Sequence, residues 1–241
     1  MISEAIKREE YKYYIHDLDA NIAAEIFQKI LELDKNASPI TRQYTVSSLY
    51  FDTLDSQDLN EKLDGILKRK KYRMRIYNND LKTIKLETKN RIGTFISKDS
   101  ERISTKLANN IINNCFDENE NENENCRNIL LNLKKNGYRS RVIVEYDREA
   151  YYLPFGNIRI TLDKNLRTYS SYKNLLNLEN KPNSPVFLDN NQILEIKFGE
   201  PLPHFIKSIL SNFSLYRCSI SKYVLSQRYN DSSSQRDHLI S

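Results

Sequence analysis

Charged residues recur at every second position in several short stretches of the chain, which is the spacing that places side chains on one face of a β-strand. In Lys71-Tyr72-Arg73-Met74-Arg75-Ile76-Tyr77, the residues Lys71, Arg73 and Arg75 alternate with residues that point the other way. Four further stretches share this pattern: Glu10 and Lys12; Lys85, Glu87 and Lys89; Arg159, Thr161 and Asp163; Glu195 and Lys197. Guanidinium and ammonium groups gathered in this way could bind phosphate oxygens through charge-assisted hydrogen bonds.

Two arrangements of such strands are consistent with the alternation. An antiparallel sheet could turn its apolar face to a core and its charged face to water. The charged faces, however, are rich in Arg, Lys and Glu, whereas a solvated face usually also carries uncharged polar residues. A sheet that closed with the charged faces inward would gather the cations around one axis, where they repel each other unless an anion lies between them. The pattern alone leaves both arrangements open.

The remaining elements follow from periodicity and turn residues. We expect strands at 10–15, 44–52, 68–77, 83–89, 95–103, 140–152, 157–163 and 192–198, and helices at 19–33, 106–115, 126–136 and 203–212. The first helix is predicted to begin at Asp19 as N-cap, and Ile22, Ile26, Ile30 and Leu33 recur in it at helical spacing. The Asn- and Glu-rich segment 117–125 is predicted to be an exposed loop, because it cannot bury apolar surface.

Length and composition set further bounds. The 241 residues suit one domain, predicted at 1–230 and followed by a polar, frayed tail at 231–241. With 37 Lys and Arg against 32 Asp and Glu, the net charge of +5 permits a polyanionic partner. Five glycines are too few for a Gly-rich phosphate loop, and the three cysteines and three histidines show no metal-ligand spacing. The chain has no run of about 20 apolar residues, so we expect no transmembrane segment and a cytoplasmic location.

Eight motifs in register carry a family resemblance. They are Arg8-x-Glu10-x-Lys12-Tyr13, Ser48-Leu49-Tyr50-Phe51-Asp52-Thr53, Lys71-Tyr72-Arg73-x-Arg75-x-Tyr77, Leu86-Glu87-x-Lys89, Val144-x-Tyr146-x-Arg148, Arg159-Ile160-Thr161-Leu162-Asp163, Leu194-Glu195-Ile196-Lys197 and Ser221-Lys222-Tyr223. Over about residues 8 to 228 the sequence resembles the VTC domain, the polyphosphate polymerase domain of the vacuolar transporter chaperone complex. That domain belongs to the triphosphate tunnel metalloenzymes of the CYTH-like superfamily.

The resemblance implies an α+β fold, a closed antiparallel β-barrel (the triphosphate tunnel) with helices packed on the outside. It also implies transfer of the γ-phosphate of ATP to a growing polyphosphate chain with Mn²⁺ or Mg²⁺. The catalytic phosphate contacts carried over are Arg73, Arg75, Lys89, Arg148, Arg159 and Lys222; the substrate-binding candidates are Lys12, Glu10, Tyr146, Glu87, Lys197 and Ser221. Glu195 would hold the metal, although it could instead be a structural partner of Arg159 or Lys197.

Several alternatives stay open. The family polymerase carries a Lys where this chain has Ser219, which motivates a tunnel-type triphosphatase acting on inorganic or nucleoside triphosphate. Synthesis needs no general base because the attacking phosphate oxygen is already ionised, whereas hydrolysis would need a carboxylate such as Glu10 or Glu87. A non-catalytic polyphosphate-binding module is a third hypothesis; no nucleic-acid motif is recognisable. Relatives are joined to membrane segments, so a membrane-protein partner could act in trans.

Overall fold

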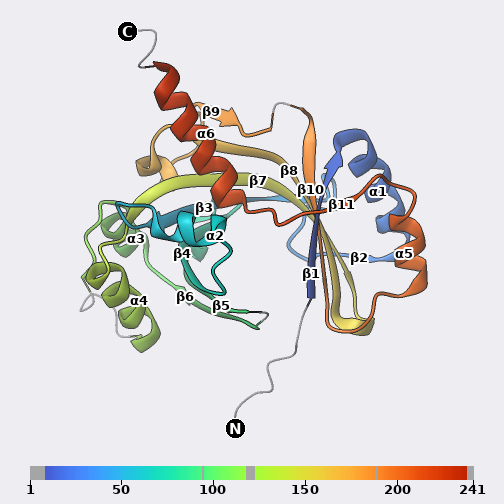
Figure 1. Cartoon of the computed structure of the whole chain (residues 1–241), viewed down its shortest axis with the longest axis horizontal. Helices are drawn as coiled ribbons and strands as arrows, with labels where there is room; N and C mark the ends of the chain where they lie inside the picture. Colours follow the sequence, from blue (N-terminus) through green and yellow to red (C-terminus); the bar gives the residue numbers. More distant parts are fainter. Residues whose placement is uncertain (1–8, 94, 118–122, 188, 238–241) are drawn as a thin grey trace. The chain divides into compact units, whose positions relative to one another are not determined.

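The computed structural model describes residues 9–93, 95–117, 123–187 and 189–237 (Figure 1). Its strands are β1 (Glu9–His16), β2 (Glu32–Leu33), β3 (Gln43–Asp52), β4 (Lys68–Tyr77), β5 (Lys85–Ile92), β6 (Phe95–Arg102), β7 (Arg139–Leu153), β8 (Ile158–Tyr169), β9 (Asn183–Pro185), β10 (Asn191–Phe198) and β11 (Tyr216–Arg217). Its α-helices are α1 (Asp17–Ile30), α2 (Gln57–Leu63), α3 (Thr105–Ile112), α4 (Glu124–Lys135), α5 (His204–Leu210) and α6 (Lys222–Asp237).

The fold is α+β, with one large antiparallel sheet. The strand order is β11-β1-β10-β8-β7-β3-β4-β5-β6, while β2 pairs with β7 and β9 pairs with β8. This order is open, beginning at β11 and ending at β6, so the closed barrel expected from the sequence stays a prediction. The expected strands are otherwise confirmed, and β8 continues to Tyr169, beyond the predicted end at residue 163.

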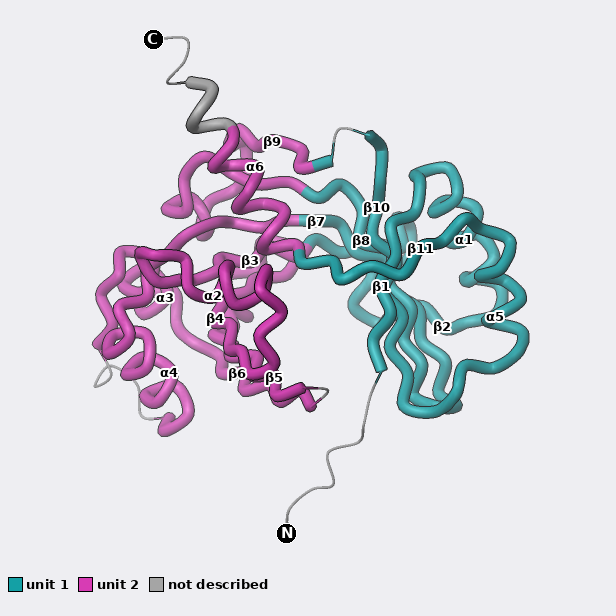
Figure 2. The backbone as a smooth tube through the Cα atoms, in the orientation of Figure 1, with its two compact units in different colours: residues 1–45, 146–166, 187–221 teal, residues 46–145, 167–186, 222–241 magenta. Residues whose placement is uncertain are grey.

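The chain divides into two compact units (Figure 2). Unit 1 comprises residues 1–45, 146–166 and 187–221, and unit 2 comprises residues 46–145, 167–186 and 222–241. Three of the five divisions fall within β3, β7 and β8, so each of these strands contributes residues to both units. Each unit has a hydrophobic core of its own.

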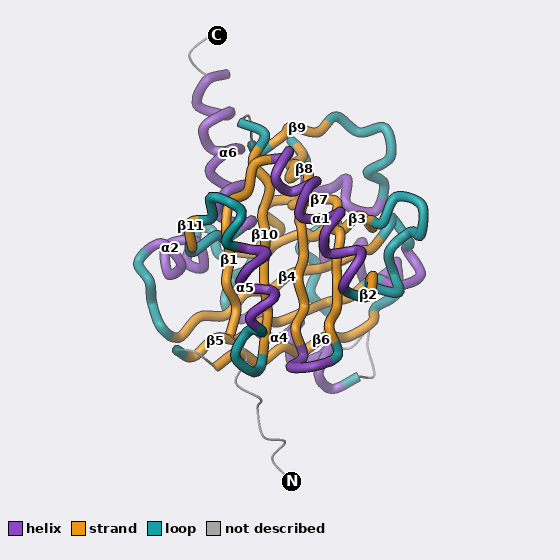
Figure 3. The backbone as a smooth tube through the Cα atoms, turned by 90° about the vertical axis from the view of Figure 1, so that its right-hand side faces the viewer, coloured by secondary structure: helices purple, strands orange, loops and turns teal. Residues whose placement is uncertain are grey.

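In unit 1, α1 and α5 cover the apolar face of the strands; Figure 3 shows both helices in front of the sheet. The predicted start of α1 was wrong, and its predicted end at Leu33 belongs to β2. The helix begins after His16, whose Nδ1 accepts a hydrogen bond from the Leu18 amide at 3.4 Å, and not at Asp19. Its buried residues are Ala20, Ala23, Ala24 and Phe27, whereas Ile22 and Ile30 are exposed. Small alanines let the helix backbone approach the sheet closely, so they, and not the larger isoleucines, occupy the contact.

In unit 2, the apolar face of β3, β4 and β5 packs against α3 and α4 (Figure 1). Met74 and Ile76 of β4 and Leu86 of β5 are all fully buried in this core. Their neighbours in sequence therefore point to the opposite face of the sheet, as the alternation predicts. This face carries the charged residues described below.

The structure also contains elements that the sequence did not predict. Helix α2 was missed, and α6 extends through residues that were expected to form a frayed tail from 231. The predicted loop 117–125 is shorter than expected, because Asn123 caps α4 and residues 124 and 125 belong to that helix. Residues 118–122 of the predicted loop lie outside the described part.

Candidate functional site

One face of β4, β5 and β6 in unit 2 concentrates positive charge. The register places residues of the three strands directly opposite one another on this face, among them Lys71 opposite Lys89 and Lys89 opposite Lys98. We call this set the cation face: Arg69, Lys71, Arg73, Arg75, Lys85, Lys89, Arg91, Lys98 and Arg102, with Glu87 at its centre. Like charges on directly opposed positions destabilise a sheet, so an arrangement of nine cations around one carboxylate favours a bound anion.

The carboxylate of Glu87 is the counter-charge that the cation face contains. Glu87 is 1% exposed, and its oxygens lie 2.7 Å from Arg73 Nε, 3.8 Å from an Arg75 nitrogen and 2.5 Å from Lys98 Nζ. Ser100 Oγ donates a further hydrogen bond at 3.3 Å. Burial alone would raise the pKa of Glu87, but the Arg75, Arg73 and Lys98 cations lower it to about 2. Glu87 is therefore ionised at neutral pH and holds the two arginines in place.

Polar groups of β3 and β4 border the two central arginines. Arg75 Nε donates to Ser48 Oγ at 3.2 Å, and an Arg73 nitrogen donates to the Tyr50 hydroxyl at 3.3 Å. A nitrogen of Arg75 also donates to the Tyr77 hydroxyl at 3.4 Å. Burial raises the pKa of the Tyr50 hydroxyl, but the Arg73, Arg75 and Lys71 cations outweigh it and lower this pKa to about 7. The cations of this face thus stabilise the negatively charged form of the Tyr50 phenol, as they would stabilise a bound anion.

The start of helix α6 is anchored beside this face. The hydroxyl of Tyr223 donates a short hydrogen bond to Asp52 Oδ2, and the Tyr223 ring stacks on Tyr50 with ring centroids 5.2 Å apart. The carboxylate of Asp52 is fully buried and also accepts hydrogen bonds from the amides of Thr53, Asp58 and Leu59. Lys222, the first residue of α6, is held next to this anchor.

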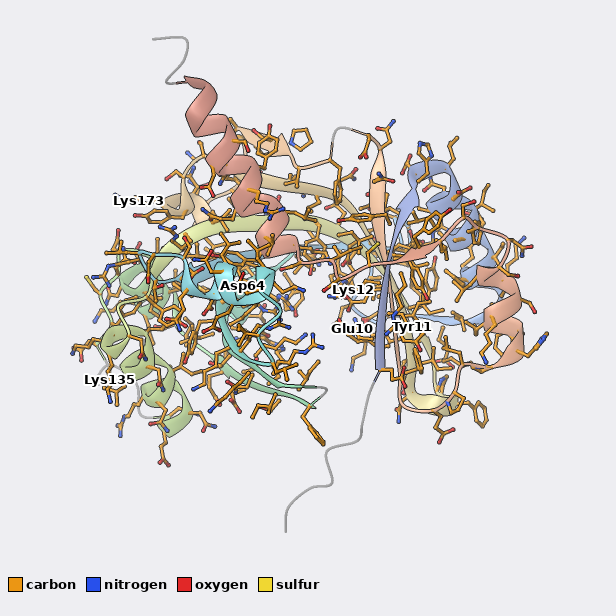
Figure 4. All side chains as sticks on the ribbon, viewed as in Figure 1. Glu10, Tyr11, Lys12, Asp64, Lys135 and Lys173 are labelled. Atoms are coloured by element: carbon orange, nitrogen blue, oxygen red, sulfur yellow. The ribbon has the colours of Figure 1, made fainter. Side chains whose placement is uncertain are left out.

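In unit 1, β1 and β10 carry a carboxylate–lysine cluster of Glu10, Lys12, Glu195 and Lys197; Figure 4 labels Glu10 and Lys12 on β1. The Nζ of Lys12 lies 3.3 Å from Glu10 and 3.5 Å from Glu195. The Nζ of Lys197 lies 2.6 Å from Glu195 and 3.7 Å from Glu10. Each carboxylate thus contacts both ammonium groups, and Lys197 is a partner of Glu195 as the alternative reading of that residue anticipated.

The two arginines of β7 and β8 in unit 1 already have carboxylate partners. Arg148 forms a two-point contact with Asp163 at 2.6 and 2.8 Å, and Asp163 is fully buried. Burial would lower the pKa of Arg148, but the Asp163 carboxylate raises it well above its ordinary value. A nitrogen of Arg159 lies 2.8 Å from Asp34 and 3.0 Å from the Tyr44 hydroxyl. These contacts fix both guanidinium groups in position.

The VTC-domain profile matches residues 7–229, nearly the whole chain. The chain belongs to the VTC-domain family. Its fold is also similar to two solved structures whose sequences are only distantly related. A candidate adenylyl cyclase from Hippeastrum, described as having a dominant triphosphatase activity, has a TM-score of 0.55 at 14% identity, over 91% of this chain and 94% of that one. A candidate adenylate cyclase from Bacillus halodurans has a TM-score of 0.52 at 12% identity, over 89% and 95%.

A comparison of this VTC domain with curated protein sequences found no match. Within the described ranges, no helix is long and apolar enough to cross a membrane.

The structure of this VTC domain distributes the predicted site residues over both units. Unit 1 contains Glu10, Lys12, Tyr146, Arg148, Arg159, Glu195, Lys197 and Ser221, and unit 2 contains Arg73, Arg75, Glu87, Lys89 and Lys222. Direct contacts join Lys12 to Glu10 and Glu195 in the first group and Arg73 and Arg75 to Glu87 in the second. Ser221 immediately precedes α6. The guanidinium carbon of Arg148 lies over the ring of Tyr146, 5.2 Å from the centroid of that ring.

Sequence reasoning missed several members of the cation face. Lys98 and Arg102 were not considered, because β6 carries charged residues on both faces: Asp99 and Glu101 alternate with Lys98 and Arg102. The nearby Tyr50 was noted in a motif without a role, because nothing in its own segment shows that cations of β4 surround its hydroxyl. Only the pairing of β3 with β4 brings the two together.

The carboxylates of this VTC domain suit a divalent cation that also binds phosphate. Over the residues that the structure describes, no group of three or more His, Cys, Asp or Glu could hold a metal ion by protein ligands alone. Mg²⁺ and similar ions, however, are usually bound by one or two carboxylates together with substrate phosphates. Glu10 and Glu195, which contact the same two lysines, supply such a pair.

Proposed function

We propose that this VTC domain is a metal-dependent phosphotransferase that transfers the γ-phosphate of ATP to a growing polyphosphate chain. The observation that supports the proposal most strongly is the cation face, where nine cations share the ionised carboxylate of Glu87, whose one negative charge cannot balance them. The excess positive charge suits a substrate with several adjacent negative charges, and membership of the VTC-domain family favours phosphate substrates.

The chemistry requires positioning and charge stabilisation and no protein nucleophile. In phosphoryl transfer the charge of the transition state lies on the peripheral phosphoryl oxygens, which fixed cations can stabilise. We assign this role to Arg73 and Arg75, since Glu87 holds both in place, and to Lys89 opposite Lys71. Lys222, next to the Tyr223 anchor, is assigned a phosphate contact as well.

Residues of unit 1 complete the assignment. Lys12, Arg148 and Arg159 are proposed phosphate ligands, and Tyr146, Lys197 and Ser221 are proposed to contact the substrate. Mn²⁺ or Mg²⁺, held by Glu195, would neutralise part of the phosphate charge, and Glu10 is proposed to contact the substrate.

The test incubates the purified protein with ATP and Mn²⁺ and separates long polyphosphate from free phosphate by gel electrophoresis. Polymer should accumulate with the wild type and be lost in Arg75→Ala. Arg127→Ala, which removes an exposed arginine of α4, is the matched control and should retain activity. Release of phosphate without polymer would reject the polymerase, and polyphosphate binding without turnover would reject both enzymatic proposals.

A triphosphatase is the second candidate. Two observations favour it: Ser219 stands where the family polymerase has a lysine, and one protein of similar fold is described as having a dominant triphosphatase activity. Hydrolysis needs a carboxylate to activate water, and a general base works best with a pKa near the operating pH. The pKa of about 2 makes Glu87 unsuitable, so Glu10 is the candidate base for this reaction.

A further inference from the structure

Four large apolar side chains are exposed at one end of the β4–β6 sheet, just before β4, at the end of β5 and at the start of β6. Leu67 is 72% exposed, Ile92 58%, Phe95 64% and Ile96 41%. They are neighbours in space, because Ile92 pairs with Phe95 in the register and the amide of Gly93 donates to the Leu67 carbonyl at 3.0 Å. Single exposed apolar residues are common on proteins, but a contiguous group at the end of a sheet indicates an interaction site.

These apolar side chains lie on both faces of the sheet. Ile92 and Phe95 share the face of the unit 2 core, beyond the residues that α3 and α4 cover, while Ile96 lies opposite Arg91 on the cation face. A helix or a groove that docked on one face would leave the other face in water. Only a binding partner that encloses this end of the sheet from both sides would cover the apolar side chains of both faces.

Cations lie among the apolar residues and in the next row of the sheet: Lys68 is opposite Ile92, Arg69 and Arg91 share the row of Ile96, and Lys70 lies one row further along. Lys68 and Lys70 of β4 are exposed on the core side, and Arg69 and Arg91 oppose each other on the cation face. Burial and the neighbouring Arg91 both lower the pKa of Arg69, as expected of cations that repel each other. The segments 65–71 and 88–98 contain no Asp or Glu. We call these four apolar residues and four cations the β4–β6 tip.

The reach of the cationic side chains suits the interface of a bilayer. Strands rise about 3.3 Å per residue, so the row of Lys70 and Asn90 lies roughly 7 Å from the row of Ile92. Interfacial segments insert their apolar side chains about 5–10 Å, to the boundary between headgroups and acyl chains. Lys70 lies at this distance, and Lys68, Arg69 and Arg91, which start from the apolar rows, have side chains long enough to extend their charges to the level of the lipid phosphates.

We propose that the β4–β6 tip binds the surface of an anionic lipid bilayer, inserting Leu67, Ile92, Phe95 and Ile96 below the headgroups and placing its cations against lipid phosphates. Charge complementarity selects this occupant. A second copy of the chain would bring Arg69, Arg91 and the adjacent lysines against the same cations, and like-charge contacts of this kind disfavour association. An anionic bilayer offers acyl chains to the apolar residues and phosphates to the cations.

The experiment measures co-sedimentation of the full chain with phosphatidylcholine vesicles that contain or lack phosphatidylserine, at physiological ionic strength. The wild type should bind the anionic vesicles and not the neutral ones. The double variant Leu67→Ser, Phe95→Ser keeps every charge and should lose at least about tenfold in partitioning. Phe155→Ser is the matched control, since Phe155 is 83% exposed in unit 1 and should bind like the wild type.

Equal binding by the wild type and the double variant would overturn the proposal, because the cation face alone would then explain attraction to the vesicles. Absence of binding by the wild type would overturn it as well. So would a wild type that is oligomeric while the double variant is monomeric, since the tip would then be a protein contact. Binding of tripolyphosphate without vesicles should be the same in the double variant and the wild type, which separates this proposal from the proposed phosphotransfer.

Discussion

Replacing Glu87 with glutamine tests whether a single carboxylate balances the cation face. The cations lower the pKa of this side chain from 4.5 to about 2, and at about 1.4 kcal/mol per pKa unit the difference corresponds to ~3 kcal/mol of folding free energy. Because Glu87 is 1% exposed, solvent screens little of this interaction. Glu87→Gln should therefore lose about 3 kcal/mol at pH 7, or about 6–12 °C in melting temperature for a chain of this length.

The dependence on pH has a definite sign. A carboxyl group whose pKa is lower in the folded state contributes its full stability above pH 4.5, and this stability is lost as the pH falls toward about 2. The difference between the wild type and Glu87→Gln should consequently be largest at pH 7 and shrink below pH 4.5. Urea unfolding at a series of pH values measures both quantities.

Added tripolyphosphate supplies a second readout. It should stabilise Glu87→Gln more than the wild type, because Arg73, Arg75 and Lys98 lose their counter-charge in the variant and a bound anion replaces it. Asp99→Asn, which removes an exposed carboxylate of β6, is the control and should unfold like the wild type. A Glu87→Gln protein with the urea midpoint of the wild type at pH 7 would refute this reasoning.

The remaining predictions concern single residues of the site. The phenolate absorbance of the wild type, followed against pH, should show a step near pH 7 that Tyr50→Phe lacks. Tripolyphosphate should move this step to higher pH, because a nearby anion opposes ionisation of the phenol. A first step only near pH 10 would contradict the assignment to Tyr50. Lys89→Gln should weaken tripolyphosphate binding about tenfold in calorimetry, because Lys89 lies between Lys71 and Lys98 and contributes one charge of the cation face to a bound anion; unchanged binding would argue against a phosphate contact in this row. Ser219→Lys, at an exposed position, should increase the ratio of polyphosphate to free phosphate among the products. An unchanged ratio would show that residue 219 does not determine which product forms.

The sheet was largely predictable because its strands have two contrasting faces. In β4 Tyr72, Met74 and Ile76 on the core face alternate with Arg73 and Arg75 on the other, so a shift by one residue would place the charges in the apolar core. Each such strand could be recognised from its own residues. The family resemblance rests on the same charged positions and is confirmed over residues 7–229.

The helices were less predictable because their contacts do not follow hydrophobicity alone. In α6 the buried positions include Ser226 and Gln227, so the segment reads as polar in sequence. Ion pairs across long sequence separations were also hidden: the contact between Arg159 and Asp34 joins positions 125 residues apart. The sequence shows which residues can be charged partners, and the tertiary fold decides which of them meet.

The hydrogen bond between Tyr223 and Asp52 has a consequence for synthesis of the chain. The two residues are 171 positions apart, so Asp52 and all strands of the cation face leave the ribosome long before Tyr223. Until α6 docks, the Asp52 carboxylate can accept hydrogen bonds from backbone amides but not from the Tyr223 hydroxyl. Tyr50 likewise lacks the Tyr223 ring that stacks on it. A prematurely terminated product would therefore carry the arginines and lysines without the helix that begins at Lys222, and only the finished polypeptide can assemble the complete set.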